Sequence, residues 1–94
     1  MDVTGLEHFL DFKEKDWKNY IKIIPQDIEK SETQKELEKV LNDKELSSSI
    51  YFHLQNKSIE WLYKNIPALN DKKPIDFIGS KKTMRILKGM LMRM

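Results

Sequence analysis

Apolar residues recur every three or four positions along most of this chain, which is the spacing of amphipathic helices. No useful run alternates between apolar and polar residues with period two, and no Asn-Gly or Asp-Gly hairpin turn is present. Strands are therefore not expected. The pattern predicts helices over 4–24, 31–41, 44–65, 74–78 and 81–94. The expected fold class is all-α, a small bundle of four to five helices.

Residues that cap or break helices mark the expected boundaries. Three positions carry a hydroxyl that can accept a hydrogen bond from a helix N-terminus, two of them with a capping-box partner. They are Thr4 with Glu7, Ser31 with Gln34, and Ser80, which follows Gly79 at the expected end of the preceding helix. Pro25 is expected to stop the first helix, and Asn42 with Asp43 the second. Four successive charged residues from Lys13 leave a break in the first helix open.

The longest expected helix, 44–65, carries the widest apolar face. At 1.5 Å per residue it would extend roughly 33 Å. Leu46, Ile50 and Trp61 share one side, and aromatic residues widen that side, as is typical of a central helix. Trp61 is therefore expected to lie in the core. Gln55–Lys57 is a candidate kink.

Pro67 and Pro74 bracket a polar turn that contains Asn70 and Asp71. Because proline has a fixed φ and no N–H to donate, each proline marks a helix edge. The stretch is expected to form an elbow before the last two helices, with its apolar residues turned inward. The expected core residues of this half are Trp61, Leu62, Pro67, Leu69, Pro74, Ile75, Ile78, Leu87 and Leu91.

Composition and charge narrow the range of functions that are expected for this chain. The 94 residues suit one compact domain, with 1–43 as a helical N-terminal extension and 44–94 as the second part. No cysteine is present, which excludes disulfides and thiolate zinc sites. No apolar run approaches the roughly 20 residues of a membrane span, and the first residues lack the basic region of a signal peptide.

The charges are unevenly distributed between the two ends of the chain. Residues 1–56 carry eight lysines and twelve acidic residues, a net charge of −4, whereas 57–94 carry nine basic and three acidic residues, a net charge of +6. Such asymmetry indicates either a partner for the basic half or a solvated, lysine-rich surface.

Catalytic chemistry is not expected. His8 and His53 have no second histidine or paired carboxylate at helical spacing, so both are interpreted as partly exposed structural residues. No glycine-rich phosphate loop or nucleophile elbow is present. The chain is therefore not expected to be an enzyme, and neither a cofactor nor a metal site is expected.

From Trp61 onward, the order and spacing of several apolar, proline and capping residues form a distinct pattern. They are Trp61, Leu62, Asn65, Pro67, Leu69, Pro74, Ile75, Ile78 and Ser80, with Leu87 and Leu91 at the spacing of two later apolar positions. This order resembles the toxin-binding domain of the Xre/MbcA/ParS family of bacterial antitoxins, over about 44–94. The family often has glycine where this chain has Asp71 or Lys72, and again at Thr83, and many members continue beyond the position of Met94.

The resemblance implies a protein partner in the cytoplasm. Members of this family bind a cognate toxin, commonly of the RES type, which degrades or transfers from NAD, and cover its NAD-binding cleft. Many also carry a helix-turn-helix, but here the N-terminal half is acidic, so DNA binding is not favoured. A DNA-binding regulator and a helical adaptor with an unrelated partner are the alternatives, and a homodimer stays open.

Partner contacts are expected at the elbow tip and along the basic side of the last helix, not on the acidic half. Lys81, Arg85 and Lys88 lie three or four positions apart and so share one outward face, with Arg93 a further turn on. The candidates are Asn70, Asp71, Lys72, Lys73, Lys81, Arg85, Lys88 and Arg93. The alternatives are that this face is only solvated, or that the methionine-rich helix lies on a membrane surface.

Overall fold

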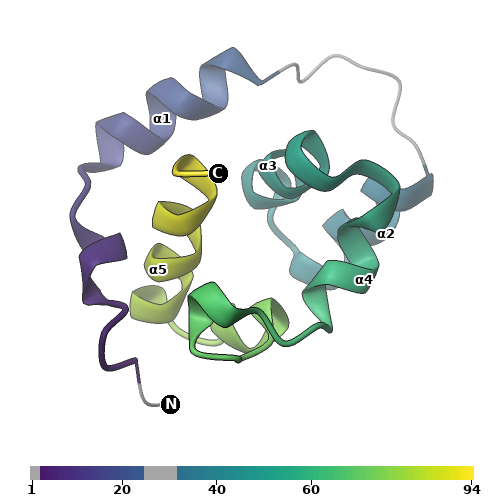
Figure 1. The fold of residues 1–94 in the computed structure, drawn as a ribbon. Coiled ribbons are helices and arrows are strands. Elements are labelled where there is room, and N and C mark those ends of the chain that lie inside the picture. The colour runs from purple at the N-terminus through teal and green to yellow at the C-terminus, as the bar shows by residue number, and fades with distance from the viewer. Residues whose placement is uncertain (1–2, 25–31) are drawn as a thin grey trace.

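The computed structural model describes residues 3–24 and 32–94. Within these ranges the chain forms only helices, joined by turns, which confirms the all-α prediction (Figure 1). None of the helices in the described ranges is long and apolar enough to cross a membrane. The elements are η1 (Glu7–Leu10), α1 (Glu14–Ile23), α2 (Glu32–Leu41), α3 (Lys44–Leu54), η2 (Gln55–Lys57), α4 (Ser58–Leu62), η3 (Pro67–Leu69), η4 (Pro74–Phe77) and α5 (Lys81–Met92), where η denotes a 3-10 helix.

The N-terminal segment, defined here as residues 3–24, forms two helices rather than the one expected over 4–24. The chain bends between η1 and α1, close to the run of charges. There the backbone N–H of Lys13 donates to the Asp16 carboxylate at 2.9 Å. A carboxylate that accepts from the start of a helix stabilises a new N-terminus, so α1 begins afresh at this point.

The expected helix caps have mixed outcomes. The N-cap position of η1 is Leu6, so the expected cap at Thr4 is wrong. Asp43 caps α3, because its carboxylate accepts the N–H of Leu46 at 3.0 Å. The expected stop at Pro25 and cap at Ser31 lie outside the described residues.

The expected long helix over 44–65 is broken in the middle. α3 ends at Leu54, and Gln55 adopts φ +49°, which is uncommon for a residue other than glycine and redirects the chain. The expected kink at Gln55–Lys57 is confirmed. However, α4 has only five residues and ends at Leu62, so the straight helix of about 33 Å is not formed.

Three consecutive serines, Ser47–Ser49, are buried in α3. Small side chains let neighbouring helices approach closely, and buried hydroxyls need hydrogen-bond partners. Ser48 accepts from the Gln34 amide of α2 at 3.3 Å. Ser49 lies 2.7 Å from the Tyr20 hydroxyl of α1. These contacts bind α3 to helices on both sides.

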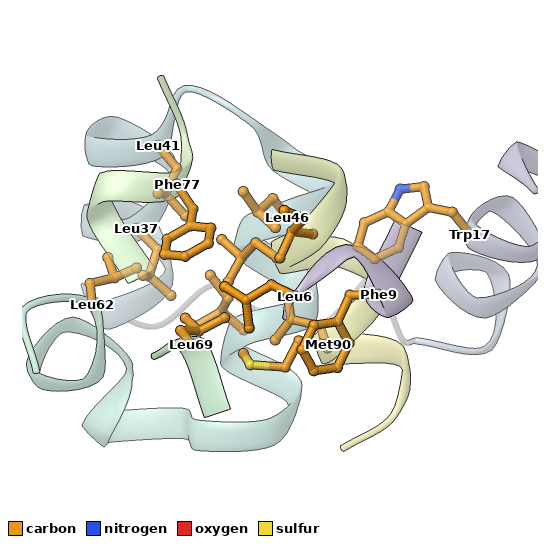
Figure 2. Packing of buried hydrophobic residues seen from close by; sticks show 14 of the residues in the cluster. Leu6, Phe9, Trp17, Leu37, Leu41, Leu46, Leu62, Leu69, Phe77 and Met90 are labelled. Atoms are coloured by element: carbon orange, nitrogen blue, oxygen red, sulfur yellow. The ribbon is translucent and has the colours of Figure 1, made fainter. Parts of the chain in front are cut away.

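One hydrophobic cluster joins the N-terminal segment to the rest of the chain. Trp17 of α1 is completely buried within it. Figure 2 shows Leu6 and Phe9 of the N-terminal segment close to Met90 of α5. The segment therefore completes the core around α5 rather than lying outside it.

The residues expected in the core of the second half are only partly enclosed. Pro67 is exposed, because it begins η3 at the surface, and its expected burial is wrong. Trp61, Ile75 and Ile78 are half-buried at the edge of the cluster. The fully enclosed residues are Leu62, Leu69, Pro74, Leu87 and Leu91.

Candidate functional site

A closed run of backbone hydrogen bonds holds the elbow between α4 and α5. The Ile66 N–H donates to the Lys72 carbonyl, and the Asp71 N–H donates back to the Ile66 carbonyl, both at 3.0 Å. Asn70 and Asp71 adopt φ +57° and +60°. This left-handed region favours glycine, and Asn and Asp tolerate it better than most other residues. Asp71 thus adopts a backbone conformation that glycine adopts more readily.

Hydroxyl groups fix the start of α5 relative to the elbow. The Ser80 hydroxyl accepts the N–H of Thr83 at 3.2 Å, which confirms the expected N-cap. The Thr83 hydroxyl donates to the Phe77 carbonyl at 2.7 Å and so attaches α5 to η4. Gly79 directly follows Ile78, the C-cap of η4, so it lies where the end of that helix was expected, although it does not adopt a positive φ.

The tip of the elbow presents a small polar surface. Asp71 and Lys73 are exposed, whereas Lys72 is half-buried. The side-chain amide of Asn70 donates to the Thr4 carbonyl at 2.9 Å. Asn70 therefore fastens the N-terminal segment, and Asp71 and Lys73 are the tip residues best placed to meet another molecule.

Arg85 of α5 does not face outward as expected. Its Nη2 donates to the Phe12 carbonyl at 2.8 Å and to the Leu10 carbonyl at 3.4 Å. The guanidinium also lies 4.2 Å from the centre of the Phe12 ring, and its Nη1 is 3.5 Å from the Glu14 carboxylate. An arginine with this many contacts to one segment is a structural clamp.

Two more cations of α5 contact the same N-terminal segment. The Lys88 ammonium lies 5.1 Å from the centre of the Trp17 ring. Arg93 lies 5.4 Å from the centre of the Phe9 ring and donates to the His8 carbonyl at 3.1 Å. Cations over aromatic faces are attracted by the ring quadrupole. The basic residues of α5 therefore serve partly to hold the N-terminal segment in place.

A groove of about 220 Å³ runs beside these contacts. We call it the basic groove, and its lining residues are Glu14, Lys81, Met84, Arg85 and Lys88. Lys81 is exposed. The eight expected partner-binding residues therefore do not form one surface. Lys81, Arg85 and Lys88 line the basic groove. Asn70 and Arg93 instead contact the N-terminal segment elsewhere, at Thr4 and His8.

The sequence gives no sign of two further grooves that meet at Trp61. We call them the Trp61 grooves. The first, of about 320 Å³, is lined by Phe9, Trp61, Ile66, Ala68, Met90, Arg93 and Met94. The second, of about 200 Å³, is lined by Leu54, Lys57, Glu60, Trp61 and Lys64. The half-burial of Trp61 is the feature that indicates these grooves. The partial exposure of Trp61 depends in turn on the break in the helix at Gln55.

Tyr20 and His53 form a polar contact between α1 and α3. The Tyr20 hydroxyl lies 2.9 Å from His53 Nε2, in addition to its bond with Ser49. Burial raises the pKa of Tyr20, and the smaller effect of the Ser49 hydrogen bond lowers it. The contact joins two helices, and neither Tyr20 nor His53 lines the basic groove or the Trp61 grooves.

The described residues give little support for metal binding or DNA binding. No group of three or more His, Cys, Asp or Glu side chains there is placed to hold a metal ion. The exposed residues of α3, the helix that follows α2, are Lys44 and Phe52. A helix that reads DNA would present several basic or amide side chains.

Comparison of the chain with protein-family models, with curated proteins and with solved structures found no match.

Proposed function

We propose that this chain is an antitoxin-like protein-binding module that neutralises a cognate RES-type, NAD-targeting toxin by covering its active site. The observation that carries the proposal is the rigid elbow. Leu69 and Pro74 anchor it in the core, while Asp71 and Lys73 stay exposed at its tip. Leu69 and Pro74 are positions at which the sequence resembles the antitoxin family, whereas that family often has glycine at the position of Asp71 or Lys72.

The physical basis of the proposed activity is shape rather than chemistry. A loop whose backbone is already fixed by hydrogen bonds and two prolines loses little conformational entropy on binding. The exposed Lys73 and Lys81 add charge at the edge, which favours fast and salt-dependent association. The proposed place of action is the cytoplasm, where the toxin would meet NAD.

The first test is whether a neighbouring gene encodes a RES-type toxin. Co-expression with that toxin then tests the proposal. The variant Lys73→Glu/Lys81→Glu reverses two exposed charges and spares the Arg85 clamp. A glutamate at 81, in the first turn of α5, suits the helix dipole, so the fold is expected to persist. We expect this variant to lose protection of the cells.

The matched control is Lys15→Glu/Lys18→Glu, which reverses two exposed charges of α1. It is expected to protect as well as the parent chain. Full protection by the elbow variant, with a normal circular dichroism spectrum, would rule out the proposed surface. Loss of protection by both variants would point to a general effect of net charge instead.

A further inference from the structure

The region around Trp61 has features that the core does not require. Trp61 is half-buried, although a tryptophan is large enough to dominate a small core. The neighbouring Tyr63 and the terminal Met94 are 52% and 53% exposed. Large apolar side chains gathered at a surface are typical of interaction sites.

The two Trp61 grooves share one lining residue, Trp61, so they are neighbours on the surface. Apolar residues three or four positions apart on a helix lie about 5–6 Å from each other, which suits two neighbouring grooves. Met90 and Met94 form part of one wall, and methionine side chains adapt to different partners.

The charges at the rim indicate what kind of helix fits. Lys57 and Lys64 line the second groove with Glu60, and Arg93 lines the first. Three cations against one carboxylate favour a partner with acidic side chains, because complementary charges speed association and exclude wrong partners.

We propose that the Trp61 grooves bind an acidic amphipathic helix of a partner protein, which inserts two apolar side chains, one into each groove. This is the helix-in-groove mode of peptide recognition. The surface shares no residue with the elbow tip or the basic groove, so the inference does not rest on the proposed function.

Selection from a peptide library tests this surface directly. The library consists of displayed 16-residue helical peptides with leucine fixed at positions four residues apart and Glu, Lys, Gln or Ala elsewhere. The bait is the full chain. We expect the enriched peptides to be acidic. Enrichment of basic peptides, or of none above background, would overturn the proposal.

Nuclear magnetic resonance then locates the bound peptide, because the chain has two tryptophans and hence two indole N–H signals. The Trp61 signal is expected to shift on titration. The Trp17 signal is expected to stay, since that indole is buried and donates to the Glu45 carboxylate at 3.3 Å. A peptide that leaves the Trp61 signal unmoved contradicts the proposal. A concentration-dependent shift of the Trp61 signal without peptide assigns the surface to self-association and also overturns it.

Charge reversal gives the matched comparison. Lys64→Glu is expected to weaken binding of the selected acidic peptide by about five-fold or more. Lys39→Glu, which reverses an exposed charge on α2, is the control and should leave the affinity unchanged. Trp61→Ala should weaken binding by about ten-fold or more, with the Trp17 signal reporting that the fold is intact. Equal binding by Lys64→Glu and the parent chain would refute the acidic character of the partner.

Discussion

Trp17 and Trp61 are the two tryptophans of this chain, and their surroundings differ in almost every respect. Trp17 is completely buried, and its ring lies beneath Lys88 of α5. Its indole N–H donates to Glu45 of α3. Trp61 is half-buried and lines two open grooves. The first region holds three helices together, whereas the second leaves apolar surface for another molecule.

The comparison teaches that the N-terminal segment is a structural part of the domain. Its aromatic residues lie under cations of α5, and its carbonyls accept from Asn70, Arg85 and Arg93. Some of the basic residues in the second half thus make contacts within the chain. Charge asymmetry along a sequence indicates an electrostatic partner, and here the N-terminal segment of the same chain provides part of that interaction.

The largest expected effect is on the free energy of unfolding. Trp17→Ala should lower it by about 3–5 kcal/mol, the usual range for truncation of a buried aromatic residue. Trp61→Ala should lower it by about 1 kcal/mol, because a half-buried ring leaves no enclosed cavity. Urea denaturation measures both. Equal losses for the two variants would mean that the tryptophans do not differ as the structure indicates. If Trp17→Ala does not fold, Trp17→Phe against Trp61→Phe makes the same comparison.

Much of the fold could be predicted from apolar spacing. Helical periodicity predicts α2 and α5 close to their observed bounds and the start of α3 at Lys44, but not the end of α3 at Leu54. Pro74 correctly marks the start of η4. The burial of Trp61 could not be predicted, because it depends on the direction of α4 after Gln55. A positive φ at a glutamine leaves no signal in the sequence. One local turn therefore redirects the apolar face of the helix that follows.

The candidate site was predictable only in part. The elbow tip follows from proline positions and polar residues, which act locally. Whether a cation of α5 faces solvent or the N-terminal segment depends on contacts 73 to 85 residues apart in sequence, as for Arg85 with Phe12 and Arg93 with His8. Helical spacing places these cations on α5 but does not show what lies opposite. The N-terminal segment therefore covers much of the expected basic face.

The approach of the N-terminal segment to α5 depends on a glycine. A Cβ at Gly89 would lie 1.9 Å from the Phe9 carbonyl oxygen, which is backbone and must move away. Gly89→Ala is therefore expected to lower the free energy of unfolding by about 1–3 kcal/mol, as for overpacking in a core. Thermal denaturation measures the loss. Gly79→Ala is the matched control, because no atom lies within 4 Å of its Cβ position. A Gly89→Ala melting temperature equal to that of the control would mean that η1 does not pack on α5 as described.

Removal of the arginine clamp should have a smaller effect. Arg85→Met keeps an unbranched apolar side chain but removes the bonds to the Phe12 and Leu10 carbonyls. We expect a loss of about 1–2 kcal/mol, because hydrogen bonds to charged groups contribute more than neutral ones. Lys81→Met removes an exposed cation of the same helix and should change stability by less than about 0.5 kcal/mol. Hydrogen exchange should show faster exchange in η1 and α1 for Arg85→Met alone. Uniform exchange in both variants would argue against the clamp.

The smallest expected effect concerns alkaline pH and lies in the region of Trp17. Burial raises the pKa of Tyr20 above its ordinary value of 10.0, so the folded chain favours the neutral phenol more than the unfolded chain does. Since the unfolded chain loses this proton first, the contribution of Tyr20 to stability is fully present below about pH 10 and is lost as pH rises through the higher folded pKa. The free energy of unfolding of the parent chain should therefore fall more steeply above about pH 10 than that of Tyr20→Phe.

The measured quantity is this slope, because Tyr20→Phe also removes the hydrogen bonds to Ser49 and His53 and so shifts stability at every pH. Tyr63→Phe, at the exposed end of α4, is the matched control in which no buried phenol is lost. Identical slopes for the parent chain and Tyr20→Phe would show that the Tyr20 hydroxyl is not held between α1 and α3, and that the tight packing of this region ends at Trp17.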